Sequence, residues 1–124
     1  HDLAEDELIT EVLVPEPPEG VRSAYVKVAE RATWDFALVS AAVQIGVREG
    51  VVERARVALG GVANVPWRAE ASEDALVGRP LTAETMAEAA EAAIAGAKPL
   101  ADNAYKLDLT RAVIRQALAA AAEG

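Results

Sequence analysis

The first half of the chain is rich in β-branched residues and, over much of its length, alternates apolar and polar side chains with the two-residue period of β-strands. Four strands are expected, over residues 8–14, 22–29, 37–47 and 51–59. A proline-rich stretch over 15–20 predicts a stiff loop between the first two. Glu49 and Gly50 join the last two, and they predict a tight hairpin because glycine adopts positive φ without steric cost.

Each of the last three predicted strands has one apolar face, which we expect to form the core. These core positions are Ala24, Val26 and Val28, then Val39, Ala41, Val43, Ile45 and Val47, then Ala55, Val57 and Leu59. The opposite face is made largely of small residues, which allow a second layer to approach closely. It carries Ser40, Ala42, Gln44 and Gly46 beside Arg54, Arg56, Ala58 and Gly60. Two interpretations stay open: a face exposed to solvent, or a docking surface for another domain.

The second half of the chain changes to the spacing of helices, and three helices are expected. They run from near Trp67 to Gly78, from Thr82 to before Pro99, and from Asp102 or Asn103 to about Ala120. Thr82 has the side chain of an N-cap, and Gly78 suits the position just after a helix. Strands followed by helices indicate an α+β fold, and the length indicates a single domain over residues 1–124.

The composition narrows the possible functions. A net charge of −8 argues against nucleic-acid binding, because phosphates repel an acidic surface. The absence of cysteine excludes disulfides and thiolate-held zinc or iron–sulfur sites within this sequence, and a single histidine, His1, leaves no histidine-based triad. Neither a membrane-spanning apolar run nor a signal segment is recognisable, so we expect a cytoplasmic domain without membrane insertion.

One loop concentrates candidate chemistry, although no catalytic residue and no metal site is expected anywhere in the chain. Lys27, Arg31, Trp34 and Asp35 lie within the segment KVAERATWD, between two predicted strands. Cations beside an indole suit a negatively charged or planar ligand edge, and binding residues concentrate on loops held by rigid elements. The alternative is a surface loop with ordinary ion pairs.

Three motifs occur in order along the chain, namely KVAERATWDFALV, ALGGVA and PWRA. With the segments around them, they make the chain resemble the C-terminal domain of the FAD-binding medium subunit in the molybdenum hydroxylase family, of the carbon monoxide and xanthine dehydrogenase type. The resemblance runs from about Asp6 to about Leu118. The fold that it implies is a three- to four-stranded antiparallel sheet with three helices packed on it, in agreement with the pattern of strands and helices.

The resemblance also implies an FAD site shared with another domain. A glycine-rich N-terminal domain, absent from this sequence, would grip the FAD, and the present domain would close over the flavin. Lys27 matches a family lysine at the flavin edge, and Asp35 matches the acidic residue of a D-x-A-x-V motif. Arg31 and Trp34 lie in the loop near the isoalloxazine ring, whereas Glu30 departs from an arginine found in many members. Because backbone amides that bind pyrophosphate normally dominate such sites, this domain alone should hold FAD poorly.

The function implied is that of an electron-transfer flavoprotein within an oxidoreductase. Substrate would be oxidised at a molybdenum cofactor in a large subunit, and electrons would pass through iron–sulfur clusters in a small subunit to FAD. This domain would orient the flavin and dock those partners, because the cofactor supplies the redox chemistry. Two alternatives are a stand-alone protein-interaction module without cofactor and, more remotely, a small enzyme that uses the loop from Lys27 to Asp35.

Overall fold

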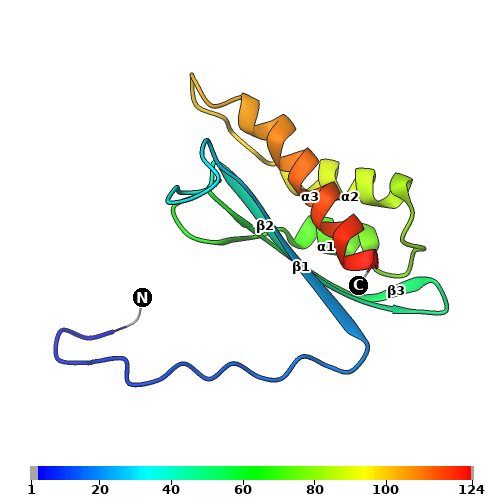
Figure 1. The fold of residues 1–124 in the computed structure, drawn as a ribbon, viewed down its shortest axis with the longest axis horizontal. Helices are drawn as coiled ribbons and strands as arrows, with labels where there is room; N and C mark the ends of the chain where they lie inside the picture. The colour runs from blue at the N-terminus through cyan, green and yellow to red at the C-terminus, as the bar shows by residue number, and fades with distance from the viewer. Residues whose placement is uncertain (1–2, 124) are drawn as a thin grey trace.

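The fold is a four-stranded antiparallel sheet with three helices on one side (Figure 1). It is seen in a computed structural model that describes residues 3–123, so His1 lies outside the described residues. The strands follow one another in the sheet in chain order. They are β1 (Val21–Val28), β2 (Val39–Arg48), β3 (Val51–Gly60) and β4 (Trp67–Arg68), followed by α1 (Glu70–Leu76), α2 (Ala83–Ile94) and α3 (Tyr105–Glu123). The predicted α+β class, antiparallel sheet and three helices are confirmed.

The core lies between the sheet and the helices. Helix α3 packs against β1 and β2, α1 packs against β3, and α2 packs on α1 and α3. The predicted core face of β2 is confirmed, because Val39, Ala41, Val43 and Ile45 are buried and Val47 packs beside them. Burying these aliphatic side chains removes apolar area from water and supplies the main favourable term in folding.

The β2–β3 hairpin forms as predicted. Glu49 and Gly50 both have positive φ, 51° and 79°, which suits the right-handed twist of paired strands. The register then shifts, because Val47 pairs with Val52 whereas Gly46 pairs with Arg54. One extra residue on β3 breaks strict alternation, as a β-bulge does. Val52 therefore joins the core, which alternation back from Ala55 would not predict.

One predicted element is wrong, and another begins later than expected. Residues 8–14 form no strand but an exposed, extended segment that runs away from the domain (Figure 1). β-branched residues favour a strand only when another strand supplies hydrogen bonds, and none of the described residues pairs with this segment. The helix expected from Trp67 begins only at Glu70, because Trp67 and Arg68 pair with Leu59 and Ala58 of β3.

The predicted helix boundaries are partly confirmed. Thr82 caps α2, since its hydroxyl accepts the amide of Thr85 at 3.2 Å while the Thr85 hydroxyl accepts the amide of Thr82 at 2.9 Å. Gly78 has a φ of 79°, as expected after a helix. Helix α2 ends at Ile94, earlier than the predicted end before Pro99, and Ala97 beyond it is exposed. The helix expected from Asp102 or Asn103 begins at Tyr105, and the Asn103 side chain accepts the amide of Leu100, upstream of α3.

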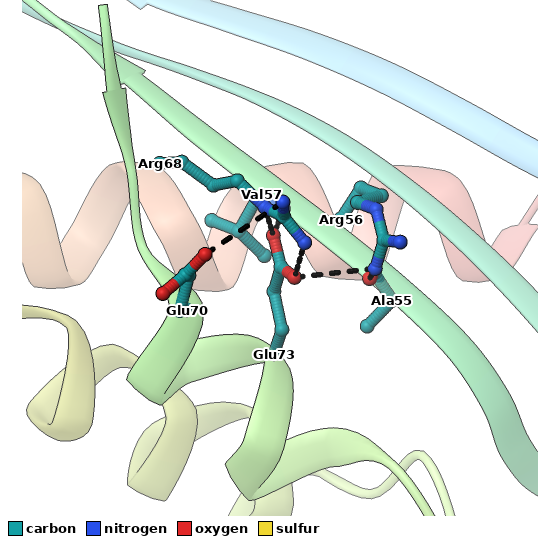
Figure 2. A network of polar contacts seen from close by, with 6 residues as sticks. All are labelled: Ala55, Arg56, Val57, Arg68, Glu70 and Glu73. Carbon is teal, nitrogen blue, oxygen red and sulfur yellow. Dashed lines mark hydrogen bonds and ion pairs between the residues drawn. The ribbon is translucent and has the colours of Figure 1, made fainter.

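A buried carboxylate holds β4 and α1 against β3 (Figure 2). Glu73 is 5% exposed. It accepts hydrogen bonds from the Arg68 guanidinium at 2.8 and 3.0 Å and from the Val57 amide at 3.0 Å, and it pairs with Arg56 at 3.3 Å. The pKa of Glu73 is held below its usual range, mainly by the hydrogen bonds from Arg68. The Val57 amide and the charges of Arg68 and Arg56 lower it further, whereas burial of the carboxylate opposes the shift.

Candidate functional site

The structure places all four predicted site residues around one loop. Residues 29–38 connect β1 to β2, with Lys27 at the end of β1 and Arg31, Trp34 and Asp35 in the loop. The loop is closed at its base by the Leu38 amide, which donates to the Val28 carbonyl at 2.8 Å. In Figure 1 this loop, in cyan, lies at the same end of the sheet as the connection that follows β3.

Asp35 organises this loop. Its carboxylate accepts the backbone amide of Arg31 at 3.2 Å and pairs with the Arg31 guanidinium at 3.8 Å. The same guanidinium donates to the Trp34 carbonyl at 3.3 Å, and the Lys27 ammonium donates to the Asp35 carbonyl at 3.2 Å. The Asp35 side chain is 24% exposed against 73% for Arg31. Asp35 therefore acts as the internal support of the loop, while the two cations stay on its outside.

Lys27 lies on the open side of β1, as the alternation predicts. Its neighbours Val26 and Val28 turn toward the core, and Lys27 itself is exposed. The ammonium contacts a backbone carbonyl rather than the Asp35 carboxylate, so its charge is not neutralised by this contact. An ammonium has three N–H donors and this carbonyl takes one, which leaves donors for an anionic group.

Two aromatic side chains project from the loop. Trp34 is 96% exposed and Phe36 is 94% exposed, although both have large apolar surfaces. Trp34 has a φ of 54°, a left-handed conformation that is unfavourable for a bulky side chain and is often found at functional sites. Phe36 was not among the predicted site residues, because the sequence places it directly before the strand expected from residue 37, whereas β2 begins at Val39. Exposed rings beside cations suit a planar, electron-rich ligand.

The small-residue face of the sheet is left open by the helices (Figure 1). Tyr25 of β1, Ala42 of β2 and Ala58 of β3 lie side by side across it, and all three are exposed. They line a shallow hollow of about 510 Å³ that Gln44 and Arg56 border. Ser40 lies on this face as expected, but it is buried and therefore not accessible there. A Cβ added to Gly60 would lie only 2.5 Å from the Ser40 hydroxyl oxygen. The Ser40 side chain therefore already fills the space at this end of the face.

A second hollow, of about 460 Å³, lies apart from the predicted site residues. Trp67, the end of α2 and the beginning of α3 line it. Within residues 3–123, no group of three or more His, Cys, Asp or Glu side chains is placed to hold a metal ion. None of the helices in that part of the chain is long and apolar enough to cross a membrane.

Known proteins are similar to this chain in sequence and in fold. Residues 24–121 match the family model described as the CO dehydrogenase flavoprotein C-terminal domain. The chain is 40% identical over 116 residues to the aldehyde oxidoreductase FAD-binding subunit PaoB of Escherichia coli (strain K12), covering 93% of this chain and 33% of that protein. It is 34% identical over 123 residues to the carbon monoxide dehydrogenase medium chain of Hydrogenophaga pseudoflava, covering 96% of this chain and 42% of that protein.

A solved structure agrees with these relatives. Carbon monoxide dehydrogenase from Hydrogenophaga pseudoflava, in a form that lacks the Mo-pyranopterin moiety of the molybdenum cofactor, matches the present fold with a TM-score of 0.82 and 37% identity. The match covers 89% of this chain and 39% of that chain. The present chain thus spans between a third and about two-fifths of the length of these proteins.

Proposed function

The chain belongs to the family of CO dehydrogenase flavoprotein C-terminal domains, and we propose that it covers the flavin in the FAD-binding medium subunit of a molybdenum hydroxylase. The observation that carries this proposal is the loop over 29–38. It offers an exposed indole, an exposed phenyl ring and the Arg31 cation, and Lys27 lies beside it at the end of β1. These groups fit the isoalloxazine part of FAD, which is planar and becomes electron-rich on reduction.

Each predicted site residue has a separate part in this proposal. Lys27 places a positive charge at the edge of the isoalloxazine ring. Trp34 covers the ring or its margin, and Arg31 adds a second cation. Asp35 holds the loop in shape through the Arg31 amide. FAD, when bound, supplies the electron transfer itself, while these side chains orient it and exclude water.

The pyrophosphate of FAD needs a different kind of site. Phosphates are normally bound by glycine-rich loops and the amides of a helix N-terminus. The only adjacent glycines in this chain, Gly60 and Gly61, pack against β2 and the stem of the loop. We therefore assign the pyrophosphate to an N-terminal FAD-binding domain of the subunit, with this chain of 124 residues as its C-terminal domain.

The proposed partners follow from this assignment. The open face of the sheet would dock the FAD-binding domain, and the complete subunit would assemble with a molybdenum-containing large subunit and an iron–sulfur small subunit in the cytoplasm. Small side chains at Ala42 and Ala58 favour this docking, because they allow close approach. The same face would also suit a stand-alone interaction module, and an FAD absorption spectrum of the complete subunit distinguishes the two functions.

The chain of 124 residues is expected to purify folded and colourless. Sheet and helices enclose a common core, but the pyrophosphate is assigned above to the FAD-binding domain. The measurements are a cooperative thermal unfolding curve and an absorption spectrum in the visible range, where flavins absorb. A stoichiometric flavin band in the purified chain would contradict the assignment of the pyrophosphate to another domain.

Replacing Lys27 with methionine in the FAD-containing subunit is expected to lower the flavin reduction potential. Methionine keeps the bulk of the stem and removes a charge that favours the reduced ring. Each tenfold loss of preference corresponds to about 30 mV for a two-electron couple, and the effect increases as water is excluded from the site. A redox titration measures it, with Lys27→Arg as the control that keeps the charge.

The alternative is that Lys27 stabilises only the loop and has no contact with the flavin. A lysine that only ties the loop to the Asp35 carbonyl at the surface contributes less than about 1 kcal/mol to stability. In that case Lys27→Met leaves both the potential and the FAD content unchanged, and Lys27 has no part in the flavin site.

A further inference from the structure

The loop over 29–38 is supported from behind by Gly61. This residue has a φ of +75°, and a Cβ added to it would lie 2.6 Å from the Leu38 carbonyl oxygen and 2.9 Å from that of Ala37. Contacts below 3.0 Å to backbone atoms cannot be relieved by rotating a side chain. The backbone at Gly61 therefore lies directly against the end of the loop, in a position that only glycine can occupy.

Helix α3 holds this glycine in place. The Lys106 ammonium donates to the Gly61 carbonyl at 2.8 Å, across 45 residues of sequence. Lys106 is the second residue of α3, where a positive charge is unfavourable because the helix dipole is positive at that end. Helix stability therefore does not explain a lysine at this position, whereas the contact with Gly61 does.

The contacts continue from Gly61 to the predicted site. Leu38, which touches Gly61, donates its amide to Val28 and closes the base of the loop. Val28 follows Lys27 directly on β1, and the Lys27 ammonium reaches back to the Asp35 carbonyl. A displacement of the Gly61 backbone would therefore move the stem that fixes Lys27 and Asp35 relative to each other.

We propose that Lys106 is a positioning residue, which braces the loop over 29–38 through the Gly61 carbonyl. The brace is a property of this chain alone. Any effect of Lys106 on the flavin rests on the function proposed above, because a displaced loop can affect the flavin only if the loop contacts it.

The brace is tested first in the chain of 124 residues. Lys106→Met should increase the hydrogen-exchange rates of the Leu38 and Arg31 amides roughly tenfold, because local opening of the loop becomes easier. The melting temperature should stay within a few degrees, since the removed hydrogen bond is exposed. Lys106→Arg, which can still donate to the carbonyl, should restore slow exchange, and Lys98→Met serves as a control at an exposed lysine. Unchanged exchange in Lys106→Met would overturn the brace.

The same variants in the FAD-containing subunit separate the brace from the proposed function. If Lys106 positions the flavin loop, Lys106→Met changes the flavin potential in the direction of Lys27→Met, and Lys106→Arg restores it. If Lys27→Met shifts the potential and Lys106→Met does not, the positioning role is wrong while the proposed function stands. If exchange in the loop increases but neither variant moves the potential, the brace stands and the flavin role of the loop is wrong.

Discussion

Replacing Glu73 with alanine is expected to lower the free energy of unfolding by about 2–4 kcal/mol. The change leaves the buried Val57 amide without its acceptor and removes the anion that Arg68 and Arg56 share. An unsatisfied buried amide alone costs about 1–3 kcal/mol. The two arginines add less, because their side chains are about half exposed and water can solvate them. For a domain of this size the loss corresponds to a fall in melting temperature of roughly 6–16 °C.

Glu70 offers a matched control on the same helix. It lies 3.7 Å from Arg68, but its side chain is 73% exposed, so Glu70→Ala should cost under about 1 kcal/mol. Equal losses of unfolding free energy in Glu73→Ala and Glu70→Ala would mean that the burial of Glu73 adds nothing to its contribution to stability. Thermal and urea unfolding of the three proteins decides the question.

The pH dependence of the unfolding free energy gives a second measure of how much Glu73 contributes to stability. Because its pKa is lowered on folding, the stabilisation that it provides is present above the pKa of the unfolded chain, about 4.3, and is lost as the pH falls through the folded value. The stability difference between the wild type and Glu73→Gln should therefore shrink as the pH falls below about 4. Glu88, whose pKa is lowered by the hydrogen bond from Arg79, titrates in the same direction, but both proteins keep it.

The parts of the fold that were predicted correctly depend on local signals. A two-residue period identifies the buried face of a strand wherever that strand pairs regularly, and the alternation from Val39 to Ile45 is an example. The hairpin at Glu49 and Gly50 and the cap at Thr82 need only the residues beside them. Their physical causes lie within a few positions of the chain.

The wrong predictions depend on partners that a local pattern does not contain. Residues 8–14 have the composition of a strand, but among the described residues none pairs with them. Trp67 follows a proline, as the first turn of a helix often does, yet pairing with β3 and the bond from Arg68 to Glu73 favour a strand there. Lys106 and Gly61 lie 45 residues apart, and no sequence motif around either residue indicates that they are in contact. The four candidate site residues were predicted from the family resemblance and from their shared segment, and the structure places them around one loop.

Replacing Ala42 with tryptophan is expected to abolish association with the FAD-binding domain while leaving the fold of this chain intact. Ala42 is exposed in the middle of the open face, with Tyr25 on one side and Ala58 on the other. The hollow of about 510 Å³ above these residues has room for an indole in the isolated chain. The melting temperature should therefore change by no more than about 2 °C, as is usual for surface substitutions.

In the complex the same indole would occupy the space into which the FAD-binding domain fits. Filling a packed contact forces side chains and backbone apart, so we expect the dissociation constant to rise by at least about 100-fold, or roughly 2.7 kcal/mol. Calorimetric titration of this chain with the separately produced FAD-binding domain measures it. Ala112→Trp places an equal bulk on the exposed side of α3, on the far side of the molecule, and should bind like the wild type. If Ala42→Trp also binds normally, the open face is not the docking surface. If instead it unfolds the isolated chain, Ala42 belongs to the packed interior, and the small residues of this face serve the fold.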